Sequence, residues 1–123
     1  MKLNRRNLLD MDIYELMEYI ENEFFVILPN GLISTEDLEF AGKMLGTLTN
    51  SYSYLANQSE YAKIVVREQK GKIPKEEYQT LMGKRDIIER GAETVKMQYQ
   101  SLSRMITVKQ EINHELRMSE VRY

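Results

Sequence analysis

The sequence has no cysteine, no tryptophan, one histidine and two prolines among its 123 residues. Without cysteine, the chain has no disulfide framework, no thiolate nucleophile and no cysteine metal site. Glu111 and His114 have the Glu-x-x-His spacing of di-iron helical bundles, but those sites need a second such pair, which this sequence lacks. We therefore expect no metal, no cofactor and no catalytic residues, and we predict that the protein is not an enzyme.

Long apolar runs are also missing. The longest run, residues 24–29, is far shorter than the roughly 18 apolar residues that a membrane-spanning helix needs. The first residues, MKLNRRNLLDMD, are basic and then acidic, without the apolar core of a signal peptide. We therefore expect no membrane partner and a cytoplasmic protein.

Positive charge is absent from one part of the chain. The composition, 42% hydrophobic and 29% charged, is that of a single folded domain. Residues 12–40 nevertheless contain eight acidic residues and no Lys or Arg, whereas basic residues are in excess after residue 40. We divide the domain into an N-terminal acidic cap segment, residues 1–33, and a helical part, residues 34–123. This polarity excludes a uniformly basic nucleic-acid-binding domain.

The acidic segment predicts a short helix and an extended connector. Asp12 and Glu15 have the spacing of a capping box, in which Asp12 accepts the amide hydrogen of Glu15. Apolar residues then recur at helical spacing: Ile13, Leu16, Met17 and Ile20. The aromatic and β-branched residues 24–28 and the turn residues Pro29-Asn30-Gly31 favour a buried extended connector.

Two long helices are predicted after the connector. Ser34 and Asp37 form another capping-box pattern, and a heptad stripe follows: Leu38, Ala41, Leu45, Leu48, Tyr52, Leu55, Ser59, Ala62 and Val66. Gly71 and Pro74 are typical of a helix end and a new helix start. A second stripe contains Tyr78, Leu81, Arg85, Ile88, Ala92, Val95, Tyr99, Leu102 and Ile106, and it shifts to Met105, Val108, Ile112 and Leu116.

These stripes predict the fold class: all-α, a long antiparallel helical hairpin resembling a coiled coil, with a small N-terminal helix and an extended connector. The helices span about residues 35–70 and 75–117, so Ser34 should lie near Leu116. Further apolar residues lie off the stripes: Met44, Ile64, Val65, Met82, Ile87 and Met97. Because one small helix cannot cover them all, we expect a homo-oligomer, most simply a dimer.

Basic residues gather where the two helices should join. Lys63, Arg67 and Lys70 share one helical face, and Lys72 and Lys75 continue across the turn. Such a tip is able to bind phosphates, with Tyr61 and Tyr78 as stacking platforms for single-stranded bases. The alternative is a solvated helix end, where Lys and Arg complement the helix dipole.

Three blocks of the sequence carry a resemblance: SYSYLANQSEYAKIVVREQKGK, KEEYQTLMGKRDIIERG and VKMQYQSLSRMITVKQEI. Over residues 38–115 the chain resembles small helical proteins of phage genomes, most closely recombination mediators of the UvsY type. The resemblance implies a phage-encoded protein of the host cytoplasm that oligomerises and helps load a recombinase. It also implies that Lys63, Arg67, Lys70 and Arg104 hold single-stranded DNA.

A second hypothesis about function involves no nucleic acid. The protein is then a protein-binding module, such as a phage-type inhibitor or a virion or assembly component. Its contact surface is acidic and imitates a row of phosphates toward a basic partner: Glu15, Glu18, Glu21, Glu36 and Asp37. Both an acidic cap and a basic tip are present, so the charge distribution is compatible with DNA binding and with protein binding.

Overall fold

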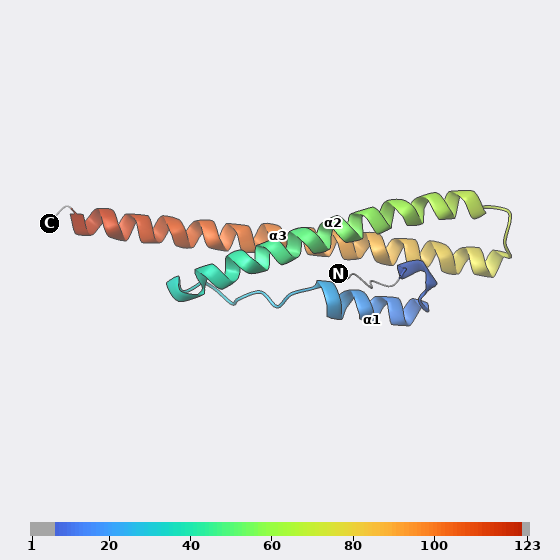
Figure 1. Ribbon diagram of the computed structural model, residues 1–123, viewed down its shortest axis with the longest axis horizontal. Helices are drawn as coiled ribbons and strands as arrows, with labels where there is room; N and C mark the ends of the chain where they lie inside the picture. The colour runs from blue at the N-terminus through green and yellow to red at the C-terminus, as the bar shows by residue number, and fades with distance from the viewer. Residues whose placement is uncertain (1–6, 122–123) are drawn as a thin grey trace.

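The structure, a computed structural model, describes residues 7–121 and contains no strand over that range. Its elements are the 3₁₀ helix η1 (Leu8–Asp10), α1 (Ile13–Phe24), the 3₁₀ helix η2 (Thr35–Asp37), α2 (Leu38–Gln69) and α3 (Lys75–Val121). α2 and α3 form a long antiparallel hairpin, and α1 lies beside α3 (Figure 1). The predicted all-α hairpin with a small N-terminal helix is therefore confirmed.

The turn between α2 and α3 lies at Gly71 and Pro74, as the sequence predicts. Gly71 has a φ of +77°, a conformation that other residues rarely adopt. The Lys72 N–H donates to the Gln69 carbonyl at 2.9 Å, and the Tyr78 N–H donates to the Pro74 carbonyl at 3.0 Å. These bonds end α2 and begin α3.

Buried residues on α2 and α3 follow the heptad stripes over most of their length. They are Ala41, Leu48, Ser51, Leu55, Ser59, Ala62 and Val66 on α2, and Ile88, Gly91, Ala92, Val95 and Leu102 on α3. The stripes are wrong at Tyr52, Tyr99 and Val108, which are 37%, 38% and 37% exposed. At Tyr52 and Tyr99 the error is local, because the next stripe residues, Leu55 and Leu102, are buried. On α2 the neighbouring Ser51 is buried instead.

α3 is much longer than its partner. Its 47 residues against the 32 of α2 correspond to roughly 70 Å and 48 Å. The Asn113 side-chain amide donates to the Thr35 hydroxyl at 3.5 Å, which places the start of the hairpin within one turn of the expected position. Leu116 lies past this contact, beyond the start of α2, and is exposed because no residue of α2 faces it. The predicted seam therefore does not extend that far.

α1 packs on α3 at two glycines. A Cβ atom at Gly91 would lie 2.8 Å from Cγ2 of Ile20, and one at Gly83 would lie 3.1 Å from Cδ1 of Ile13. The pairs Ile13–Gly83 and Ile20–Gly91 ascend together along both helices, so α1 runs parallel to α3. The absence of side chains at these positions lets the two helices approach closely.

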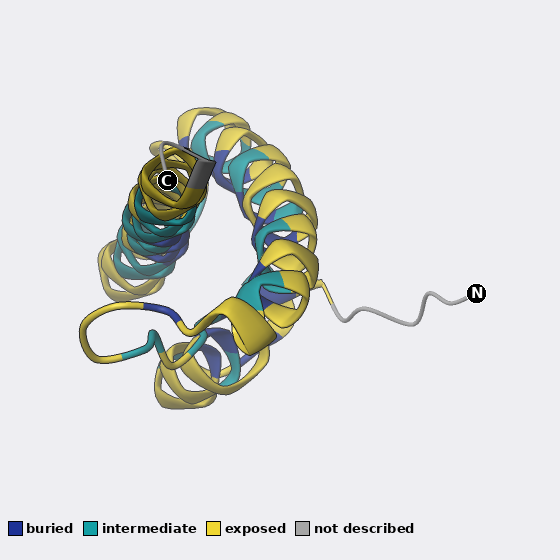
Figure 2. Cartoon of the chain, turned by 90° about the vertical axis from the view of Figure 1, so that its left-hand side faces the viewer, coloured by how far each residue is buried: buried dark blue, intermediate teal, exposed yellow. Residues whose placement is uncertain are grey.

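Further contacts hold the N-terminal segment in place. The Lys84 ammonium donates to the Leu9 carbonyl at 3.0 Å, and Phe24 stacks on Tyr54 of α2 with ring centroids 5.5 Å apart. Viewed end on, the buried residues face the space enclosed by α2, α3 and the N-terminal segment (Figure 2). The segment therefore forms a third layer that closes one side of the hairpin.

The glycine contact gives a first prediction. Gly91→Val should lower the free energy of unfolding by about 1–3 kcal/mol, because the new methyl groups overlap buried Ile20. The matched control is Gly42→Val, since a Cβ at Gly42 meets nothing within 4 Å. The control should change stability by less than about 0.5 kcal/mol. Urea denaturation measures both, and equal effects would contradict the close approach of α1.

Candidate functional site

The predicted basic tip is partly assembled. Arg67 and Lys70 end α2, Lys72 lies in the turn, and Lys75 begins α3. All four side chains are exposed, and no ion pair joins any of them to another described residue. The acidic residues Glu68, Glu76 and Glu77 are exposed beside them and reduce the positive potential.

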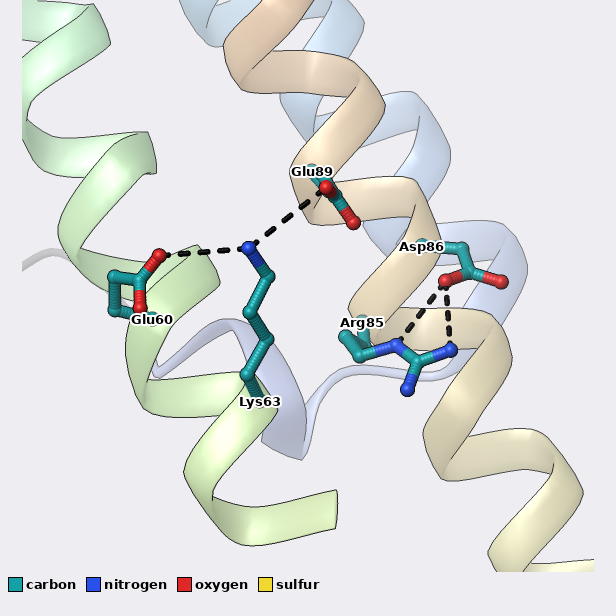
Figure 3. Close-up of polar contacts among 5 residues, drawn as sticks. All are labelled: Glu60, Lys63, Arg85, Asp86 and Glu89. Carbon is teal, nitrogen blue, oxygen red and sulfur yellow. Dashed lines mark hydrogen bonds and ion pairs between the residues drawn. The ribbon is translucent and has the colours of Figure 1, made fainter. Parts of the chain in front are cut away.

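Lys63 does not belong to this open group. Its ammonium lies 3.4 Å from a Glu60 carboxylate oxygen and 3.7 Å from a Glu89 carboxylate oxygen (Figure 3). Glu89 is on α3, so Lys63 links the two long helices across their surface. Nearby, Arg85 pairs with its neighbour Asp86 at 3.0 Å. Ion pairs this exposed contribute about 0–1 kcal/mol each, but they occupy the cations.

Arg104 is exposed but distant from the tip. It lies 29 residues beyond Lys75 on the same continuous helix, which corresponds to roughly 43 Å. A single short ligand cannot contact both positions. The structure therefore leaves four of the six predicted nucleic-acid-binding residues as an open group, holds Lys63, one turn away, in ion pairs, and places Arg104 far from the tip.

The predicted acidic residues lie in two exposed groups. Glu15, Glu18 and Glu21 are on α1, whereas Glu36 and Asp37 are in η2, at the far end of the connector. On α1, exposed Tyr14 and Met17 accompany the carboxylates. The acidic residues thus border the N-terminal layer at both ends rather than forming one compact site.

The two predicted helix caps differ in outcome. The Ser34 hydroxyl accepts the Asp37 N–H at 3.2 Å and donates to the Asp37 carboxylate at 2.9 Å, so this cap is confirmed. The Asp12 carboxylate accepts from the Tyr14 N–H at 3.1 Å rather than from Glu15, so that expected partner is wrong by one residue. Both bonds satisfy amides at a helix start.

The connector between α1 and η2 is held by one side chain of α3. The Val26 N–H donates to Oε1 of Gln98 at 3.0 Å, and Nε2 of Gln98 donates to the Val26 carbonyl at 2.9 Å. The amide therefore satisfies both backbone groups of a half-buried residue that has no strand partner. This fixes the path of the extended segment along α3.

A groove opens between the connector and the start of α2. Its volume is about 480 Å³, and its floor includes the buried residues Ile33, Ala41 and Leu102. Ile27, Leu32 and Phe40 line it while remaining 93%, 66% and 64% exposed. This groove was not predicted from the sequence. The apolar run 24–28 signalled burial, and nothing in its pattern indicated that Ile27 would face solvent.

Within residues 7–121 there is no group of three or more His, Asp or Glu residues that could hold a metal ion. No helix in this part of the chain is long and apolar enough to cross a membrane. His114 is exposed near the end of α3.

Comparisons with protein-family models, with curated proteins and with solved structures found no match to this chain. The resemblance to recombination mediators of the UvsY type therefore stays a prediction.

The Gln98 contact gives a second prediction. Gln98→Ala should lower the free energy of unfolding by about 1–2 kcal/mol, because it leaves the Val26 N–H and carbonyl without a partner. Amide hydrogens of residues 25–34 should exchange faster, which mass spectrometry measures. Gln100→Ala, at an exposed position on the same helix, is the control. Unchanged exchange in Gln98→Ala would show that the amide does not hold the connector.

Proposed function

We propose that the chain is a non-enzymatic protein-binding module that acts through its N-terminal layer. The observation that carries this proposal is that exposed apolar side chains lie beside acidic residues, on α1 and again where η2 joins α2. Tyr14 and Met17 lie beside Glu18 and Glu21, and Phe40 follows Glu36 and Asp37. Apolar side chains bordered by polar ones are typical of surfaces that bind other proteins.

The negative charge of this layer favours a basic partner. Residues 12–40 have eight acidic residues and no Lys or Arg, so the surface attracts a basic protein and repels nucleic acid. Electrostatic attraction of this kind accelerates association and suppresses contacts with acidic partners.

A second candidate is the one that the resemblance implies, an accessory protein of phage-type recombination or replication that binds single-stranded DNA. The four exposed cations Arg67, Lys70, Lys72 and Lys75 support it. The neighbouring carboxylates and the ion pairs of Lys63 weaken it, because both lower the charge that phosphates would meet. We rank this candidate below the protein-binding one.

Self-association belongs to both candidates. Tyr52 and Tyr99 line an open pocket with Thr49, Lys96 and Gln100, and Leu116 and Met118 are exposed where α3 extends past α2. These apolar surfaces lie outside the N-terminal layer. A homo-oligomer that covers them remains our expectation.

Photo-crosslinking in the cells that express the protein tests whether α1 or the basic tip contacts a partner. A photoreactive phenylalanine replaces exposed Tyr14 on α1 or, as the matched position, exposed Tyr61 on α2 near the tip. We expect position 14 to form adducts with a different protein, insensitive to nuclease, and position 61 to form none. Nucleic-acid adducts from position 61 with no adduct from position 14 would contradict the proposal and favour the second candidate.

A binding titration tests the second candidate separately. If the tip holds single-stranded DNA, changing Arg67, Lys70 and Lys72 to Gln should flatten the salt dependence by about two units, at ~0.7 per phosphate contact. Lys63→Gln is the control and should change binding little, because Lys63 pairs with Glu60 and Glu89. Absence of binding by the unmodified protein at about 50 mM salt would remove this candidate.

A further inference from the structure

The groove between the connector and α2 has an unusual set of exposed residues. Ile27, Leu32 and Phe40 are among the most exposed large apolar side chains in the described part of the chain, and all three line the groove. Single exposed apolar residues need no explanation, but three around one cavity of about 480 Å³ form a continuous apolar surface.

The backbone explains why these side chains remain uncovered. Gln98 fixes Val26, and the chain then bends at Gly31, whose φ is +82°. Within residues 7–121, no backbone-to-backbone hydrogen bond involves residues 27–33. The connector therefore crosses the surface as a single extended segment, and no other described element covers its outer side. Its apolar side chains have partners only on the α2 and α3 side.

The charge around the groove is of one sign. Of the described residues that line it, only Asp37 is charged, and Glu36 precedes it in η2. Asp37 accepts a hydrogen bond from Ser34 but has no cationic partner among the described residues. Lys43, the nearest cation in the sequence, is 3.8 Å from Glu39 instead. An apolar ligand with adjacent positive charge therefore complements this site.

We propose that this groove binds a cationic segment of another protein, one that places a large apolar side chain between Leu32 and Phe40 and a Lys or Arg beside Asp37. This inference rests on the proposed protein-binding function and specifies where and with what chemistry it occurs. The anchor displaces water from the apolar lining, and the cation supplies attraction and orientation.

Charge argues against two other occupants. A second copy related by a two-fold axis would bring the same patch against itself, with Asp37 and Glu36 facing their own equivalents. Nucleic acid would bring phosphates to the same carboxylates. A partner protein with positive charge meets neither obstacle.

Selection from a random peptide library displayed on phage, against the full chain, tests the proposal. We expect enriched peptides to carry Lys or Arg next to a large apolar residue, and replacing those cations by Glu should abolish binding. Leu32→Gln with Phe40→Gln should weaken the selected peptides by roughly tenfold or more. Ile64→Gln with Met97→Gln is the matched control, because both side chains are exposed on the long helices outside the groove, and it should change affinity by less than about twofold.

One further variant isolates the charge. Asp37→Asn keeps an oxygen that accepts from Ser34 but removes the negative charge. It should weaken the cationic peptides by roughly three- to tenfold and flatten their salt dependence. Circular dichroism should show unchanged helicity in every variant, because all substituted side chains are exposed.

The other outcomes separate this inference from the proposed function. Cationic peptides that are weakened by Tyr14→Gln with Met17→Gln, and not by the groove variants, would overturn the groove and leave the protein-binding function standing. Selection of acidic or uncharged peptides would overturn both. A library without binders overturns the inference, and a dimer of the unmodified chain that becomes a monomer in Phe40→Gln would assign the groove to a second copy.

Discussion

At Gly91 the three helices of this protein come within contact of one another, and the position of the N-terminal layer depends on that meeting. A Cβ atom there would lie 2.8 Å from Cγ2 of Ile20 and 3.9 Å from Cδ1 of Leu55, so a side chain at this position would force Ile20 or α1 to shift. With α1 in contact, Phe24 reaches Tyr54 and Val26 reaches Gln98. The connector groove exists because these contacts bring the chain past α2 in extended form.

Much of the hairpin could be predicted because its causes are local and periodic. Leu48, Leu55, Val95 and Leu102 are buried where the heptad count places them. Gly71 and Pro74 mark the turn because few other residues suit those backbone positions. The count failed at Tyr52, Tyr99, Val108 and Leu116. The first three side chains are partly exposed beside a seam that is buried on both sides of the two tyrosines, and Leu116 lies past the start of α2.

The site was less predictable because its positions are set by tertiary contacts. The N-terminal segment meets α3 at Lys84, Gly91 and Gln98, which are spaced by seven but are polar or lack a side chain, so no apolar pattern identifies them. The helical spacing of Lys63 places it on one face of α2 with Arg67 and Lys70. That spacing could not show that Glu89 of α3 lies within 3.7 Å of Lys63.

The N-terminal layer and the groove both depend on α1 lying parallel on α3, with Ile13 over Gly83 and Ile20 over Gly91. Nuclear Overhauser contacts between the isoleucine methyl groups and the glycine α-protons measure this arrangement directly. We predict a strong contact from Ile20 to Gly91 and one from Ile13 to Gly83. Contacts with the register reversed, or Ile20 methyl groups without any contact to α3, would contradict it.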